Sequence, residues 1–190
     1  MDAAYRYWFL TSTTYGTWLP GDARGFVSRF PQADGEFESH NQIDTPYDKD
    51  DPDWKAACQT RLKCEPVYLS KDQAAAVINQ FLETADVRGW TLYIASVMCN
   101  HFHALISGPA DTRASRILGD LKAYSSRRLS KRHCKPASES WWTESGSRRP
   151  VNNEPAFREV YEYILNQPHC LAQWKRELDN TVIIPRDGNR

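Results

Sequence analysis

The sequence predicts an α+β fold, a ferredoxin-like (RRM-like) antiparallel sheet with helices on one face, followed by a further helix near the C-terminus. Two apolar, β-branched segments are separated only by Met98-Cys99-Asn100, a connection short enough for an antiparallel hairpin. Helical periodicity separates the other predicted strands, in the order β-α-β-β-α-(β)-α. With 190 residues and seven tryptophans, we expect a single domain over residues 1–190 with a buried core.

The first half of the chain combines clear elements with one long insertion. Residues 5–14 are rich in aromatic and β-branched side chains and predict the first strand. A long insertion is expected at about residues 20–68, and residues 30–66 within it are polar, acidic and without a clear period. Ser70 to Gln73 has the pattern of a capping box that opens a helix, and Gly89 is typical of the helix end.

The middle of the chain predicts a hairpin and a helix. The second and third strands are expected at residues 90–97 and 101–107. A helix with one apolar side follows, and Asp111 or Thr112 is expected to cap it.

The last part predicts a short strand, a helix and a tail. The strand is expected at residues 148–151, and Asn153 or Glu154 begins the helix. This helix runs to about Gln167, because the residue before a proline disfavours helical backbone. A C-terminal tail is expected from about residue 170.

Composition excludes several classes of protein. No apolar run approaches the roughly 18 residues that a membrane helix needs. The N-terminus lacks the basic segment and the cleavage site of a signal peptide. The five cysteines form no Cys-x-x-Cys pair, and such a scattered, odd-numbered set is typical of reduced thiols. We therefore expect a cytoplasmic protein with no membrane partner.

A net charge of zero conceals a strong asymmetry along the chain. Residues 34–53 hold eight acidic residues and one lysine, whereas residues 113–149 hold ten Arg or Lys and three acidic residues. The second segment is the expected polyanion-binding face, although a charge run can also be simply a solvated surface. Its position directly after a pair of histidines favours the polyanion.

That pair, His101-Phe102-His103, is the strongest chemical signal. Side chains alternate along a strand, so both imidazoles point to one face and Phe102 enters the core from the other. About sixty residues later, Tyr163 and Gln167 stand four positions apart, which places both on one face of a helix. The structural alternative for each pair is two hydrogen-bonded strand histidines and a buried tyrosine.

If this helix lies over the strand, two imidazoles and a carboxamide oxygen can hold one divalent cation beside a phenolic oxygen. A mixed nitrogen and oxygen site with open positions suits Mg²⁺ or Mn²⁺. Tyrosine has an ordinary pKa of about 10 and is a poor nucleophile at neutral pH until a cation favours the phenolate. The combination indicates tyrosine attack on a phosphodiester.

These motifs resemble a known family. MCNHFHALISGP resembles the Asn-His-x-His strand of the HUH single-strand DNA transposases. YILNQ resembles the catalytic helix of the single-tyrosine transposases of small insertion sequences, which are similar to the REP-associated tyrosine transposases. FLTSTTYGTWLPGD and WWTESGSRRPV resemble the same group, so the likeness touches roughly residues 5–25 and 90–170. Cys99 departs from the proline that the family often has there, and the segment 30–66 is less usual.

The resemblance implies a metal-dependent single-stranded DNA endonuclease and strand transferase that cleaves at or near hairpin or palindromic repeat sequences. His101, His103 and Gln167 would bind the metal, and other family members have Asn at the third position. Tyr163, on a C-terminal catalytic helix, would form a 5′-phosphotyrosine intermediate. Strand exchange would then need no ATP, because the covalent link conserves the energy of the broken bond. The resemblance leaves a monomer with a cis site and a homodimer with a shared site both open.

The basic segment supplies the candidate DNA contacts. Phosphate contacts are predicted for Lys122, Arg127, Arg128, Arg148 and Arg149, with solvated surface as the alternative. Base stacking is predicted for Trp141 or Trp142, with core packing as the alternative. Tyr124 is the rival nucleophile, but the residue four positions later is Arg128, a cation that would repel a metal.

Three other functions remain open at this level. The first is a relaxase-like or replication-initiator-like HUH nuclease, which shares the chemistry but normally carries further domains. The second is a non-catalytic single-stranded nucleic-acid-binding protein derived from a transposase. The third is a metal hydrolase acting on a small molecule, in which the tyrosine and the basic helix would have no role.

Overall fold

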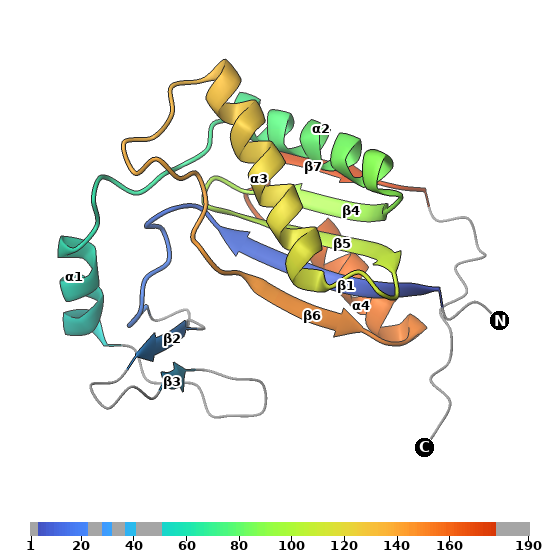
Figure 1. The fold of residues 1–190 in the computed structure, drawn as a ribbon, viewed down its shortest axis with the longest axis horizontal. Coiled ribbons are helices and arrows are strands. Elements are labelled where there is room, and N and C mark those ends of the chain that lie inside the picture. Colours follow the sequence, from blue (N-terminus) through green and yellow to red (C-terminus); the bar gives the residue numbers. More distant parts are fainter. Residues whose placement is uncertain (1–3, 23–27, 32–36, 41–50, 178–190) are drawn as a thin grey trace.

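A five-stranded antiparallel sheet forms the centre of the computed structural model, which describes residues 4–22, 28–31, 37–40 and 51–177 (Figure 1). Its strands, in spatial order, are β6 (Ser147–Val151), β1 (Tyr5–Thr13), β5 (His101–Pro109), β4 (Thr91–Val97) and β7 (Ala172–Lys175). Every neighbouring pair is antiparallel. The predicted α+β class with a ferredoxin-like antiparallel sheet is confirmed.

The helices lie on both faces of this sheet. Helices α2 (Lys71–Arg88) and α3 (Ala114–Arg132) cover one face, and α4 (Glu154–Leu165) covers the other (Figure 1). The alternation along β5 follows from this arrangement. Phe102 packs in the core under α2 and α3, whereas Leu105 packs in the core under α4. His101 and His103 share the face of Leu105, so the histidine pair faces the α4 side of the sheet.

Local signals determine the ends of α2. Ser70 and Gln73 form the predicted reciprocal capping box, and each side chain binds the other residue's backbone N–H. Gly89 ends the helix with a left-handed φ of 67°.

The start of α3 differs from the prediction. Its N-cap is Arg113, which makes no side-chain cap, and neither Asp111 nor Thr112 caps the helix. The backbone N–H of Thr112 donates instead to the carbonyl of Pro109, and this turn moves the helix start beyond both candidates.

Helix α4 begins as predicted and ends earlier than predicted. The side chain of Asn153 accepts a hydrogen bond from the N–H of Ala156, which makes Asn153 the N-cap. The helix ends at Leu165 with Asn166 as its C-cap, so Gln167 lies just outside the helix.

The segment expected as an insertion contains three short elements. Strands β2 (Ser28–Pro31) and β3 (Phe37–His40) form a separate two-stranded sheet, and α1 (Pro52–Thr60) follows. Most of the acidic run at residues 34–53 lies outside the described residues. An ion pair of 3.1 Å between Lys55 and the buried carboxylate of Asp22 fastens α1. Gly21 has a φ of 78°, and a Cβ there would lie 2.3 Å from the carbonyl oxygen of Asp51, so only glycine fits.

The segment expected as a tail from about residue 170 supplies a strand. Residues 172–175 form β7, which pairs with β4 at the edge of the sheet. Among the described residues, no helix is long and apolar enough to cross a membrane.

Candidate active site

The two histidines of β5 lie side by side, as the strand period predicts. Their ring centroids are 4.9 Å apart, with the planes at 79°. Phe102 between them is fully buried on the opposite face, where its ring meets Phe81 and Trp142 edge to face. The imidazole pair is therefore anchored through the core residue that separates its members.

Neighbouring oxygens orient both imidazoles. The Nδ1 atom of His101 lies 2.7 Å from the side-chain oxygen of Asn100, and the Nδ1 atom of His103 lies 2.7 Å from the hydroxyl of Thr11. The oxygen of Asn100 can only accept, so Nδ1 of His101 carries the proton and the ring's lone pair is on Nε2. Metal-binding histidines characteristically have such an oxygen partner on the second ring nitrogen.

Burial keeps His103 neutral. Its side chain is only 6% exposed. Desolvation, with a smaller contribution from the neighbouring His101, lowers the pKa of His103 to about 3. A neutral imidazole is the form that binds a metal.

Tyr163 lies over this pair. Its ring centroid is 5.3 Å from that of His103 and 5.7 Å from that of Phe9, both in edge-to-face geometry. Half of its side-chain surface remains exposed. Tyr161 has a different environment: it is buried in the core under α4, and its hydroxyl donates to the carbonyl of Arg176. Tyr163 is thus the tyrosine of α4 whose ring lies against His103.

Gln167 follows the end of α4, and its side chain bonds to the backbone of Tyr163. Its side-chain nitrogen donates to the Tyr163 carbonyl oxygen at 3.0 Å, which leaves the carboxamide oxygen as the remaining donor atom for a cation. Among the described residues there is no cluster of three or more His, Cys, Asp or Glu. The donor set, two imidazoles and one carboxamide oxygen, fits a divalent cation that takes its remaining ligands from substrate and water.

The two arginines of β6 lie on opposite faces of the sheet. Arg149 is exposed and stands directly across from Phe9, so it shares the face of Tyr163 and the histidines. Arg148 stands across from Leu10, whose side chain packs in the core under α2 and α3. Only Arg149 of the predicted phosphate contacts is brought to the histidine face.

Lys122 is used within the fold. Its ammonium donates to the carbonyl oxygens of Thr143, Glu144 and Ser145, the last two at 2.9 and 3.0 Å. These three bonds use all three donors of the group. Desolvation lowers the pKa of Lys122 to about 8. The side chain therefore holds the segment that leads into β6 and has no donor left for a phosphate.

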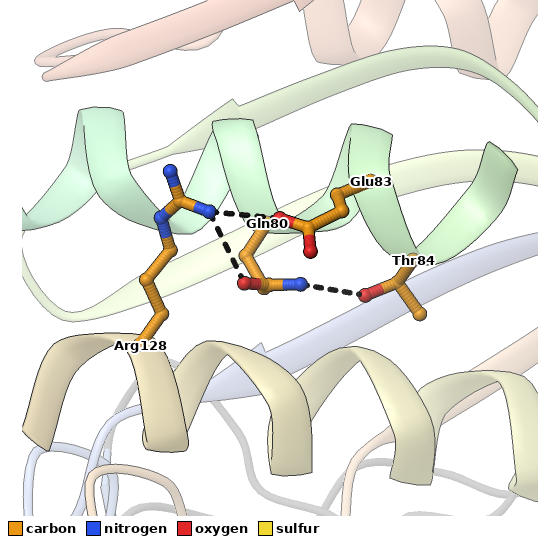
Figure 2. Close-up of polar contacts among 4 residues, drawn as sticks. All are labelled: Gln80, Glu83, Thr84 and Arg128. Atoms are coloured by element: carbon orange, nitrogen blue, oxygen red, sulfur yellow. Dashed lines mark hydrogen bonds and ion pairs between the residues drawn. The ribbon is translucent and has the colours of Figure 1, made fainter. Parts of the chain in front are cut away.

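Two further arginines of α3 bind other side chains of the protein. Figure 2 shows Arg128 reaching across to α2, where it donates to Glu83 at 2.9 Å and to Gln80 at 3.3 Å. Gln80 in turn donates to Thr84, so the network ties the two helices together (Figure 2). The guanidinium of Arg127 lies 5.0 Å from the ring centroid of Tyr124, on the helix far from the histidines. Because α3 covers the face of the sheet opposite to the histidines, Tyr124 is separated from the candidate site.

The tryptophan pair is part of the core. Trp141 and Trp142 are each 3% exposed, and their indole nitrogens donate to Ser130 and Ser125. Neither ring presents a face on which a DNA base can stack. The structure thus favours the core-packing alternative over the predicted stacking role for Trp141.

Two residues that orient the site were not among the predicted site residues. Thr11 stands directly across from His103 in the β1–β5 register, and Phe9 meets both Tyr163 and His103. Both lie in the segment FLTSTTYG, where every second residue faces the same side of the sheet. From that alternation, the sequence could have predicted that Phe9 and Thr11 lie on one face of the sheet. A cavity of about 810 Å³ lies near the opposite end of β5, between the end of α2 and the start of α3, and belongs to a different region.

Comparison with protein families decides the relationship. The model of the family described as "Transposase IS200 like" matches residues 58–167, more than half of the chain. The chain belongs to the IS200-like transposase family. Membership in this transposase family implies a DNA-processing enzyme. All four predicted metal and nucleophile residues of this IS200-like transposase lie inside the matched segment.

Two solved structures were also found to be similar to this IS200-like transposase. One is a REP-associated tyrosine transposase bound to a REP hairpin, with 10% identity and a TM-score of 0.44 over 86% of this chain and 67% of the other. The second is described as a "putative transposase" from Deinococcus radiodurans R1, with 15% identity and a TM-score of 0.46 over 88% and 95% of the two chains. A search of curated proteins gave no significant match.

Proposed function

We propose that this transposase is a metal-dependent single-stranded DNA endonuclease and strand transferase with Tyr163 as its nucleophile. One observation carries the proposal. A half-exposed tyrosine on α4 lies edge-on to a buried, neutral histidine of β5, which stands beside a second histidine on the same face. A core tyrosine would be buried, and surface histidines would not need oriented oxygen partners on their Nδ1 atoms.

The proposed reaction is a transesterification. The phenolic oxygen of Tyr163 attacks the scissile phosphorus, the bond between phosphorus and the 3′ oxygen breaks, and the phenolic proton passes to that oxygen. The products are a 5′-phosphotyrosine link and a free 3′-hydroxyl, a polarity that follows the family resemblance. Attack on this link by the 3′-hydroxyl of another strand reverses the step and joins the strands.

His101, His103 and Gln167 would hold a divalent cation such as Mg²⁺ or Mn²⁺. Once bound, the cation would neutralise charge on the phosphate and favour the phenolate. The protein contributes the orientation. Thr11 and Asn100 orient the imidazoles, and the ring of Phe9 supports the edge of Tyr163. The exposed guanidinium of Arg149 on the same face would bind the DNA backbone.

The expected substrate is single-stranded DNA with hairpin or palindromic repeats. Membership in a transposase family supports DNA as the partner. The open, half-exposed position of Tyr163 supports an extended strand rather than a small enclosed ligand.

A denaturing gel tests the proposal. Purified protein is mixed with a labelled single-stranded oligonucleotide that carries a palindromic hairpin from the flanks of its own gene, with Mg²⁺ or Mn²⁺ or with EDTA. We expect a covalent protein–DNA band that needs the metal and is lost in Tyr163→Phe and His101→Ala. Tyr5→Phe is the matched control, because Tyr5 is 47% exposed at the far end of β1 and should leave the band unchanged.

Two results would contradict this function. A covalent band that survives Tyr163→Phe would show that another residue is the nucleophile. DNA binding on a native gel that is insensitive to EDTA, with no covalent band for any hairpin of a panel, would favour a non-catalytic single-stranded DNA-binding protein.

A further inference from the structure

The C-terminal end of α4 is fastened to the sheet by two side chains. Ser96 of β4 is fully buried, and its hydroxyl donates to the carbonyl oxygen of Ile164 at 2.8 Å. Gln173 of β7 stands directly across from Ser96 in the strand register. Its side-chain nitrogen donates to the hydroxyl of Ser96 at 2.8 Å and to the carbonyl oxygens of Ile164 and Leu165 at 3.3 and 3.1 Å.

The donors and acceptors of this group are consistent. The hydroxyl of Ser96 donates one hydrogen bond and accepts one. One hydrogen of the Gln173 amide reaches Ser96, and the other is shared between the two helix carbonyls, as is common at helix ends. We call Ser96 and Gln173 the clasp.

The clasp binds the helix where free carbonyls are expected. The last four carbonyls of a helix have no partner within it, and at an exposed end they bind water. Here a buried hydroxyl and an amide from the sheet occupy two of them. The end of α4 therefore has a defined position relative to β4, next to the strand that carries the histidines.

Tyr163 depends on this backbone position. It directly precedes Ile164, whose side chain is fully buried. Within the described residues, the hydroxyl of Tyr163 makes no hydrogen bond, and its ring meets Phe9 and His103 of the sheet edge to face. Neither contact holds the hydroxyl, so the position of the backbone next to Ile164 contributes to the distance between Tyr163 and His103.

We propose that Ser96 and Gln173 are positioning residues that hold the tyrosine helix on the sheet of its own chain and so set the reach of Tyr163. The inference rests on the proposed function, since it assigns a role in the attack by that tyrosine. Ser96 of β4 bonds directly to α4 of the same chain, so the clasp places Tyr163 beside the histidines of its own molecule.

Single-turnover kinetics test the clasp. The full chain, in excess over the labelled hairpin oligonucleotide, is followed by the growth of the covalent band, which yields a rate constant and a final amplitude. Gln173→Met keeps the length of the side chain without its N–H donors, and Ser96→Ala is a smaller change in case the first variant folds poorly. Gln59→Met, at an exposed position of α1, is the matched control.

We expect the rate constant to fall about 10- to 100-fold in both variants, because small misplacements of a nucleophile have costs of this size. The amplitude and the Kd for DNA should stay within about twofold, since the contacts to DNA are unchanged. A merely structural role would lower the amplitude, through loss of folded protein, and leave the rate constant unchanged. That result, or unchanged kinetics in both variants, would overturn the proposal.

Hydrogen exchange separates this inference from the proposed function. We expect amide exchange at the end of α4, which includes the N–H of Asn166, to be faster in Gln173→Met, while α2 is unaffected. Unchanged exchange would overturn the clasp even if no DNA substrate were cleaved. A wild-type protein without any covalent band, but with faster exchange in the variant, would refute the function and leave the clasp as a helix anchor only.

Discussion

Acidification should destabilise the metal-free protein through His103. This imidazole is almost fully buried, and burial lowers its pKa from 6.5 to about 3. Below pH 6.5 the unfolded chain therefore binds a proton at this position that the folded chain does not bind. Binding of this proton stabilises the unfolded state. The contribution of the neutral His103 to the free energy of unfolding is therefore fully present above about pH 6.5 and is lost progressively as the pH falls towards 3.

The magnitude follows from the two pKa values. Between about pH 7.5 and pH 5, the unfolded histidine becomes almost fully protonated while the folded one stays neutral. Integration over this interval gives a loss of about 2 kcal/mol in the free energy of unfolding.

Urea unfolding followed by circular dichroism, in EDTA at both pH values, measures this loss. Other groups titrate as well, so the quantity of interest is the difference between the wild type and His103→Asn, whose amide can still bond to Thr11. His169→Asn, at an exposed position after α4, controls for the removal of one histidine. We expect the wild type and His169→Asn to lose about 2 kcal/mol more than His103→Asn. Equal losses in all three proteins would refute the reasoning.

Three further predictions concern the site and its surroundings. Thr11→Val removes the partner of an imidazole nitrogen and should weaken the metal about 10- to 100-fold, measured as the Mn²⁺ concentration that half-saturates covalent-band formation. Arg149→Ala should weaken DNA binding and reduce its logarithmic salt slope by about 1, whereas Arg128→Ala should lower stability and leave that slope unchanged. A mixture of Tyr163→Phe and His101→Ala should form no covalent band, because the proposed clasp holds each tyrosine beside the histidines of its own chain.

Each of these has a clear contrary outcome. If Thr11→Val needs the same Mn²⁺ concentration as the wild type, the hydrogen bond with Thr11 does not contribute to metal binding by His103. A change of salt slope in the Arg128 variant would show that the α3 face takes part in DNA binding. A covalent band restored by mixing would demonstrate exchange of the tyrosine helix between chains.

The elements that depend on neighbouring residues were predictable from the sequence. The capping box at Ser70, the left-handed Gly89 and the Asn153 cap each involve contacts within a few positions of the chain. The hairpin of β4 and β5 follows from two apolar runs and a short turn. The start of α3 was predicted incorrectly, because a turn bond from Thr112 to Pro109 competed with capping.

The candidate site was predictable only in part. The shared face of His101 and His103 follows from the strand period, and the different burial of Tyr161 and Tyr163 follows from the helix period. The sequence could not distinguish basic residues that bind within the fold from those that face outward. Lys122 has its donors occupied by carbonyls that lie more than twenty positions later, which no local pattern reveals.

By itself, the sequence determined the class of fold and the hairpin that carries the histidines. It also determined which candidate residues are near neighbours along the chain, His101 with His103 and Tyr163 with Gln167. Periods of 2 and 3.6 residues set these features, and both act over a few positions. The tertiary structure alone decided that α4 and Arg149 share the histidine face, that Trp141 is buried and that β7 fastens α4 through Gln173. These outcomes depend on which face each element packs against, and burial and charge pairing across the sheet settle that only once the whole chain has folded.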